Sequence, residues 1–257
     1  MIIRASESSH WYAKDGTPRY TTLAKSGKQR PTTLRDARTE GLVPSVTTVL
    51  GCAAKPALIA WMQRQVLLAA LTLPKKPLEN DQEYLDRIML DAKEQGRSAA
   101  DAGTDIHAAV ESFYSGKGIT KHPEHVRAVE NILNQTFGQM DWIAEKSFAH
   151  DHGFAGKVDL YATEVVVDIK SKEFTDSSTV VGYDEHLMQL AAYRVGLGMP
   201  NARCANVYVS RNVPGLAVVV EWEQAELKRG WGMFCALLEY WSLKNKYRVE
   251  KDRKSVV

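Results

Sequence analysis

The chain has 257 residues, 44% of them hydrophobic and 25% charged, and its formal net charge is +2. This composition suits one sizeable globular domain with an N-terminal segment attached, and the near-neutral charge argues neither for nor against a nucleic-acid partner. The three widely spaced cysteines exclude a four-cysteine iron–sulfur cluster and argue against a structural zinc site.

The odd number of cysteines also indicates reduced thiols, which are typical of the cytoplasm. The first ten residues lack the apolar core of a signal peptide, and no stretch approaches the ~20 apolar residues of a membrane helix. We therefore expect a cytoplasmic protein with no membrane partner.

The first half of the chain is predicted to be mostly helical. Residues 1–40 are polar and rich in turns, and they include a candidate hairpin that turns at Asp15 and Gly16. Gly96 and Gly103 are candidate break points in a long helical stretch, which we expect in one or two pieces. Apolar residues at helical spacing predict three helices, over residues 55–73, 81–115 and 124–136.

The second half is predicted to switch to strands. A three-stranded meander is followed by a helix, two more strands and a last helix. The expected strands cover residues 143–149, 155–162, 165–170, 206–210 and 216–222, and the expected helices cover 184–197 and 224–246. The simplest packing of these layers is one mixed sheet covered by helices, which makes the fold α/β.

Two aspartates in the predicted meander suggest a function. Asp159 lies on its second strand and Asp168 on its third, where cross-strand neighbours can sit side by side. Two such carboxylates repel each other unless a hard cation such as Mg²⁺ or Mn²⁺ lies between them. Lys170 shares a strand face with Asp168, since side chains alternate along a strand. This set is suited to hydrolysing a phosphodiester, although polar strand ends and a surface lysine would explain the same residues.

Three further features favour the catalytic interpretation. His107 and Glu111 lie at i and i+4 on the second predicted helix, and Gln189 and Tyr193 do so on the helix after the meander. Glu145 lies on the first strand of the meander, near enough to be a further carboxylate. Each feature alone fits ordinary packing, and whether Glu145 or Glu111 contributes to a metal site stays open.

Four short motifs follow one another along the chain. They are GTDIH at 103–107, GKVD at 156–159, DIK at 168–170 and QLAAY at 189–193. This series resembles the RecB-like branch of the PD-(D/E)XK nuclease superfamily, which has a helical histidine, a glycine–aspartate motif, D-x-K and a Q-x-x-x-Y helix in this order. PSVTTVL and the following Lys55, Leu58 and Trp61 are similar to the N-terminal region of the mitochondrial genome maintenance exonuclease and related phage exonucleases.

The resemblance implies a restriction-endonuclease-like core, in which helices flank a central mixed β-sheet, with helical N-terminal additions. It implies a nuclease that uses Mg²⁺ or Mn²⁺. Some relatives also carry an iron–sulfur cluster held by four cysteines, which the three cysteines of this chain cannot supply. Lys170 would be the catalytic lysine, with Lys172 on the same strand face as an alternative, and Gln189 and Tyr193 would organise the site and contact DNA. The implied metal ligands are the side chains of His107, Asp159 and Asp168 and the main-chain carbonyl of Ile169.

Other residues are candidates for guiding DNA. Basic clusters at 14–38 and 244–254 are either solvated surface or phosphate contacts. Hydroxyl groups suit phosphates and aromatic rings stack on bases, although each ring taken singly is explained by packing. The candidate polar contacts are Ser45, Thr47, Thr48 and Lys172, and the candidate stacking residues are Trp11, Tyr12 and Tyr20.

Together these features predict a divalent-metal-dependent DNA exonuclease that acts on single strands or DNA ends, in phage or bacterial recombination or repair. Residues 1–100 would guide the DNA, and residues 101–257 would form the nuclease core. The alternatives are a nuclease-like module that binds DNA without cutting it and a structure-specific endonuclease. Recombination or replication proteins are candidate partners, and the sequence does not indicate the oligomeric state or the polarity of digestion.

Overall fold

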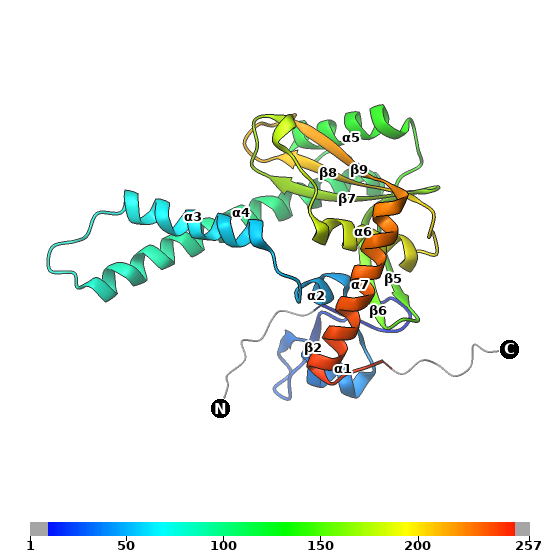
Figure 1. The fold of residues 1–257 in the computed structure, drawn as a ribbon, viewed down its shortest axis with the longest axis horizontal. Coiled ribbons are helices and arrows are strands. Elements are labelled where there is room, and N and C mark those ends of the chain that lie inside the picture. Colours follow the sequence, from blue (N-terminus) through cyan, green and yellow to red (C-terminus); the bar gives the residue numbers. More distant parts are fainter. Residues whose placement is uncertain (1–9, 250–257) are drawn as a thin grey trace.

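The computed structural model describes residues 10–249 and centres on a five-stranded sheet in the order β5-β6-β7-β8-β9. The first three strands form the predicted antiparallel meander, β8 is parallel to β7, and β9 returns antiparallel to β8. The strands are β5 (Ile143–His150), β6 (Phe154–Ala162), β7 (Val165–Lys172), β8 (Arg203–Ser210) and β9 (Ala217–Trp222). The predicted central mixed sheet is therefore confirmed, and it is consistent with a restriction-endonuclease-like core (Figure 1).

Two predictions fall partly outside the described residues. The signal-peptide argument rests largely on residues 1–9, and the basic C-terminal cluster continues beyond residue 249. Within residues 10–249, no helix combines the length and the apolar character needed to cross a membrane.

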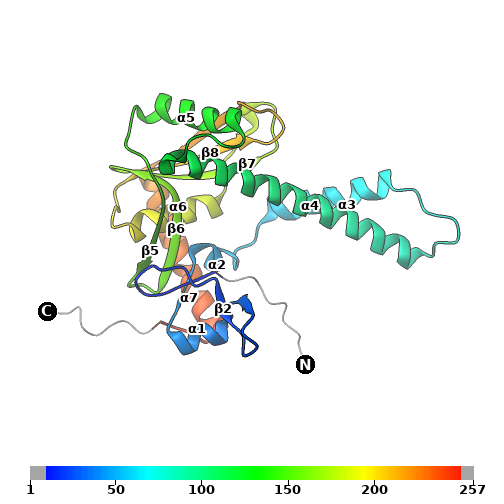
Figure 2. The same ribbon diagram turned by 180° about the vertical axis from the view of Figure 1, so that it is seen from behind.

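Helices cover both faces of the sheet, as Figures 1 and 2 show from opposite sides. On one face, α4 (Asp81–Ser112) and α5 (Pro123–Phe137) pack against the sheet through a buried apolar cluster. On the other face, α6 (Asp184–Gly196), α7 (Gln224–Asn245) and the short α2 (Val46–Leu50) share a second cluster with the strands. The four long helices agree with the predicted ones to within about two residues at most ends, the usual uncertainty of helix boundaries, whereas α2 was not predicted as a helix.

Strand β7 lies at the centre of the sheet and separates these two clusters. Val165, Val167 and Ile169 belong to the cluster on the α4–α5 face, whereas Val166 belongs to the cluster on the α6–α7 face. Because successive side chains of a strand point to opposite faces, Asp168 is placed on the same face as Val166. The apolar alternation of VVVDIK thus determines which side of the sheet the acidic residue faces.

The N-terminal segment forms small sheets beside this core. The predicted turn is present, since Gly16 has a φ of 86° and its N–H donates to the carbonyl of Ala13. However, β1 (Trp11–Tyr12) pairs with β4 (Val43–Pro44), and Trp11 and Tyr12 are 0% and 2% exposed. Their burial makes packing the explanation for these two aromatic residues, so base stacking is not available to them. The remaining elements of the segment are β2 (Thr21–Leu23), β3 (Gln29–Pro31) and α1 (Leu34–Glu40).

Helix α4 runs without a break through both candidate glycines, so the suggestion of a break at Gly96 or Gly103 was wrong. A Cβ atom on Gly103 would lie 2.5 Å from Oγ of Ser171, so glycine here permits close packing of α4 against β7. The helix ends at Ser112 and continues as one π-helical turn, η1 (Phe113–Lys117). The proposed division of roles between residues 1–100 and 101–257 stays a prediction, and its boundary lies inside α4.

Two glycines of α7 provide a test of the α6–α7 packing. A Cβ atom on Gly230 would lie 2.8 Å from Cγ and 3.2 Å from the carbonyl oxygen of Leu187, whereas one on Gly232 would meet nothing within 4 Å. Gly230→Ala should lower the free energy of unfolding by about 1–3 kcal/mol through overpacking. Gly232→Ala should raise it by up to about 1 kcal/mol, because alanine favours the helix. Urea unfolding of both variants checks this, and equal effects would contradict the described packing.

Candidate active site

The strands β6 and β7 separate from each other at Asp159. Their ladder ends with the pair Leu160 and Val167, and its continuation would have placed Asp159 opposite Asp168. Instead, Oδ2 of Asp159 accepts a hydrogen bond from the main-chain N–H of Ile169 at 2.8 Å. A carboxylate thus replaces a main-chain carbonyl as the partner of β7, and the two strands diverge beyond this point. We call this position the β6–β7 fork.

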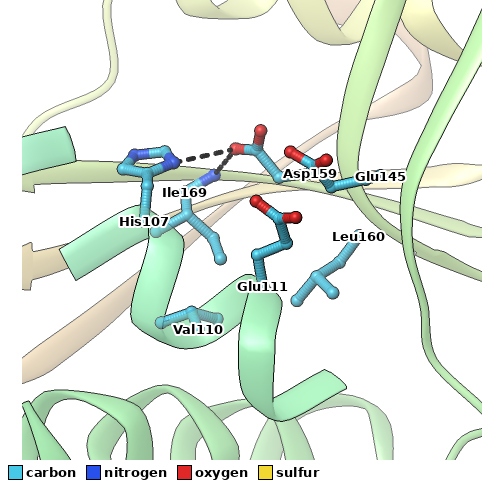
Figure 3. Close-up of a pocket in the computed structure, with 7 residues that line it drawn as sticks. All are labelled: His107, Val110, Glu111, Glu145, Asp159, Leu160 and Ile169. Atoms are coloured by element: carbon cyan, nitrogen blue, oxygen red, sulfur yellow. Dashed lines mark hydrogen bonds and ion pairs between the residues drawn. The ribbon is translucent and has the colours of Figure 1, made fainter. Parts of the chain in front are cut away.

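A small pocket opens at the β6–β7 fork, between the sheet and α4 (Figure 3). Its volume is about 30 Å³, which is enough for one or two water-sized groups. Nδ1 of His107 lies 3.7 Å from Oδ2 of Asp159, and the predicted sharing of one helix face by His107 and Glu111 is confirmed. The pocket is lined by His107, Val110, Glu111, Glu145, Asp159, Leu160 and Ile169.

Acidic groups are concentrated in this pocket. Burial raises the pKa of Asp159, and the negative charge of Asp168 raises it further. Burial also raises the pKa of Glu111, with a further contribution from its hydrogen bond to the carboxyl group of Glu145. Lys157 forms an ion pair with Glu145 at the edge of the pocket. The pocket therefore favours bound cations or protons, as expected for closely spaced carboxylates.

A second set of polar contacts surrounds Asp168, whose side chain is 1% exposed. Nζ of Lys170 lies 2.8 Å from each of its carboxylate oxygens, and Nδ2 of Asn206 donates to Oδ2 at 2.8 Å. Lys170 also donates to Oε1 of Gln189 at 3.1 Å, and Nε2 of Gln189 donates to the hydroxyl of Tyr193 at 2.9 Å. The ammonium group of Lys170 is thereby held by partners on β7 and α6.

The glycine of the GKVD motif has a packing role beside this network. A Cβ atom on Gly156 would lie 2.8 Å from Cε1 of Tyr193, so only glycine leaves room for the ring over β6. Burial and the charges of Asp168 and Asp159 together raise the pKa of Tyr193 well above its usual value. Tyr193 is therefore close to both aspartates and stays a neutral hydroxyl.

The pocket supplies some of the ligands that the implied metal ion needs. Within residues 10–249, no three His, Cys, Asp or Glu side chains converge closely enough to form a complete metal cage. The chemistry of the donors nevertheless fits Mg²⁺ or Mn²⁺, since the pocket offers carboxylate oxygens and one imidazole. The mutual repulsion of Asp159 and Asp168 is also what a bound cation would relieve.

The other predicted contacts lie outside the pocket. Nζ of Lys172 donates to the hydroxyl of Tyr183 at 2.9 Å, so Lys170 and not Lys172 contacts Asp168. Ser45 is 3% exposed and its hydroxyl caps α2 by accepting the N–H of Thr48. Thr48 also accepts the N–H of His10, and Thr47 is exposed. Of these three hydroxyl residues, Thr47 is thus the most accessible to DNA.

Sequence reasoning missed Asn206 and Trp222. Asn206 is fully buried, and its Oδ1 accepts the indole N–H of Trp222 at 2.8 Å while its amide donates to Asp168. In the sequence Asn206 marks only the start of a predicted strand. Its role follows from the parallel pairing of β7 with β8, which places it beside Asp168. The available signal was a polar residue, Asn206, among the apolar residues of the strand sequence CANVYV.

No protein-family profile and no curated protein sequence matches this chain. Among solved structures, a candidate exonuclease from Eubacterium rectale is 15% identical with a TM-score of 0.40, covering 61% of this chain and 72% of its own. An alkaline exonuclease from Laribacter hongkongensis is 15% identical with a TM-score of 0.35, covering 73% and 97%. The same enzyme in complex with dAMP is 14% identical with a TM-score of 0.35, covering 79% and 87%. These likenesses are remote.

Asn206→Ala should destabilise the protein by about 2–4 kcal/mol, because it leaves the buried indole N–H of Trp222 without its acceptor and removes a hydrogen bond to a charged group. Asn131→Ala is the matched control, since Asn131 is exposed on α5 and alanine is the better helix former there. Urea unfolding measures both changes. A loss at Asn206 no larger than at Asn131 would contradict the described network.

The folding stability should depend on pH through His186. Its Nδ1 lies 2.8 Å from the hydroxyl of Tyr208, and burial together with the charge of Lys170 lowers its pKa to about 4. The unfolded histidine has a pKa near 6.5. Unfolding therefore takes up a proton between these values, and this contribution to stability is lost as the pH falls from about 6.5 to 4.

The variant His186→Gln keeps a polar side chain but does not titrate. Its free energy of unfolding should depend less steeply on pH than that of the parent between about pH 4 and 6.5, while the other histidines act equally in both proteins. Urea unfolding across this range gives both curves. Parallel curves would contradict the lowered pKa of His186.

Proposed function

We propose that the protein is a divalent-metal-dependent deoxyribonuclease, and specifically an exonuclease of single-stranded DNA or DNA ends. The observation that best supports this proposal is that two groups of polar contacts, one around Lys170 and one in the acidic pocket, meet at Ile169 on β7. Lys170, held by Asp168 and Gln189, lies on one side of Ile169, and the acidic pocket with His107 and Asp159 lies on the other. The order of the motifs, which resembles RecB-like nucleases, supports the same reaction.

Lys170 is proposed as the catalytic lysine. Its side chain is 24% exposed, so it is accessible to substrate while Asp168 beneath it is buried. The two carboxylate oxygens and the Gln189 side-chain carbonyl accept hydrogen bonds from the ammonium group and limit its rotation. A fixed ammonium group can orient a water molecule or stabilise the negative charge that develops on phosphoryl oxygens during hydrolysis. The contact between Gln189 and Tyr193 steadies this arrangement from α6.

The metal would be held by the side chains of His107, Asp159 and Asp168 and by the carbonyl of Ile169, as the motif resemblance implies. When bound, Mg²⁺ or Mn²⁺ lowers the pKa of water and neutralises phosphoryl oxygens. The Ile169 N–H already fixes Asp159 in place. Glu111 and Glu145 extend the acidic surface of the pocket, and Lys157 next to Glu145 offers a cation to a DNA phosphate.

Aromatic residues near Lys157, at the edge of the pocket, are suited to stacking on a nucleobase. The rings of His10 and Tyr20 are 4.7 Å apart, and Lys157 lies close enough for its charge to act on the His10 imidazole. His10 is exposed and Tyr20 is partly exposed, unlike Trp11 and Tyr12. We propose that the DNA strand passes this cluster, with bases on the rings and a phosphate near Lys157. The process would be phage or bacterial recombination or repair in the cytoplasm.

Lys170→Ala should reduce DNA cleavage by about 10²–10⁴-fold, because the fixed ammonium group is lost at the reacting phosphate. Lys228→Ala is the control, since Lys228 is an exposed lysine on α7. The assay uses 5′- and 3′-labelled single- and double-stranded DNA with Mg²⁺, Mn²⁺ or EDTA. The parent should cut only with a metal present, and release of mononucleotides would identify an exonuclease.

Two results would contradict this proposal. Cleavage by Lys170→Ala at the parental rate would remove the assigned role of the lysine. DNA binding by the parent without cleavage under any metal condition would instead indicate a nuclease-like binding module.

A further inference from the structure

A helical arm extends away from the body of the protein, as Figures 1 and 2 show. It consists of α3 (Pro56–Thr72), the connecting loop and the first half of α4, and we define it as residues 56–95. Ten of the fifteen exposed large apolar side chains among residues 10–249 lie on this arm. They are Leu58, Ile59, Met62, Leu67, Leu68, Leu71, Leu78, Leu85, Met89 and Leu90.

The apolar side chains of α3 point in several directions. Ala69 is buried on the side that packs against α4, whereas Leu67 and Leu71 are 64% and 83% exposed and lie one turn apart. Arg64 is the only charged residue between Pro56 and Thr72. A helix that is apolar around most of its circumference is normally covered on more than one side. In this chain α4 covers only one side of α3.

The exposed apolar area of the arm is large. At about 100 Å² for each fully exposed aliphatic side chain, the ten residues present roughly 600 Å². This apolar area is larger than a few scattered surface leucines would expose. It is concentrated on the projecting arm, which the body of the same chain does not cover. Two such surfaces would bury at most about 1,200 Å² of apolar area, which is the lower limit for a specific protein interface.

The charges on the arm argue against DNA or a lipid surface as its partner. Residues 56–95 carry six acidic and five basic side chains, so the arm has no net positive charge, and the exposed charges in the first turns of α4 are mainly acidic and include Asp81, Glu83 and Asp86. Phosphate-rich partners require a surface of net positive charge, which the arm lacks. A second arm meets the apolar requirement, and α3 of one copy, whose only charged residue is Arg64, is complementary in charge to the acidic start of α4 of the other copy. Two helical hairpins packed in this way form a four-helix bundle.

We therefore infer that the arm, residues 56–95, is a self-association surface, which joins two copies of the chain through a four-helix bundle. The inference does not depend on the proposed nuclease function. It rests on the exposed apolar side chains of the arm, the nearly uncharged α3 and the acidic start of α4.

Sedimentation velocity and light scattering of the full chain test this inference. From about 1 to 100 µM the parent should reach twice the mass of a single chain, with a concentration dependence typical of a dimer. Leu67→Glu/Leu71→Glu should increase the dissociation constant at least ~100-fold, because two charges would enter the bundle core unpaired. Far-UV circular dichroism checks that this variant stays folded.

Leu23→Glu/Leu243→Glu is the matched control, since these leucines are 67% and 63% exposed and lie outside the arm. The control should associate like the parent. A parent that stays monomeric throughout, or a Leu67→Glu/Leu71→Glu variant that associates like the control, would overturn the inference. Binding of a monomeric parent to lipid vesicles would assign the arm to a membrane surface and would overturn it equally.

Discussion

The hydrogen bond from the Ile169 N–H to the Asp159 carboxylate determines the form of the candidate site. An ordinary ladder would give this N–H a main-chain acceptor on β6 and would press Asp159 against Asp168. A buried N–H without any acceptor would cost about 1–3 kcal/mol. Because the carboxylate supplies the acceptor, the strands can diverge without that cost, and the pocket opens where they part. The acidic residue thus has a structural role before any ligand is bound.

The contacts in the pocket and the contacts around Lys170 both depend on glycines that let helices approach the strands closely. Gly103 allows α4 to pack against β7 beside Ser171, and Gly156 allows the Tyr193 ring to lie over β6. His107 follows Gly103 by about one helical turn, so the same close contact carries the imidazole to Asp159. In these motifs the glycines therefore serve helix–sheet packing, while His107 and Asp159, which follow them, line the candidate site.

Much of this arrangement could be predicted from local sequence. Period-two alternation gave the strands, and i, i+4 spacing gave the pairs His107 with Glu111 and Gln189 with Tyr193, since neighbours on one element are fixed by its geometry. Asn206 was not predictable, because its contact with Asp168 arises from a parallel pairing between residues 38 positions apart. The continuity of α4 was also missed, since tertiary packing overrides the low helix propensity of glycine.

Helix α4 connects the arm to the pocket as one rigid element. It carries Leu85 and Met89 on the arm and His107 and Glu111 in the pocket, without a break at either glycine. Leu85 and His107 are 22 positions apart, which is about 33 Å along a helix axis. If two arms associate, the pockets of the two copies would therefore be held at a set separation, because a continuous helix bends only gently. The arm would then determine how the two candidate sites face each other, and each site would still be built from the residues of one copy.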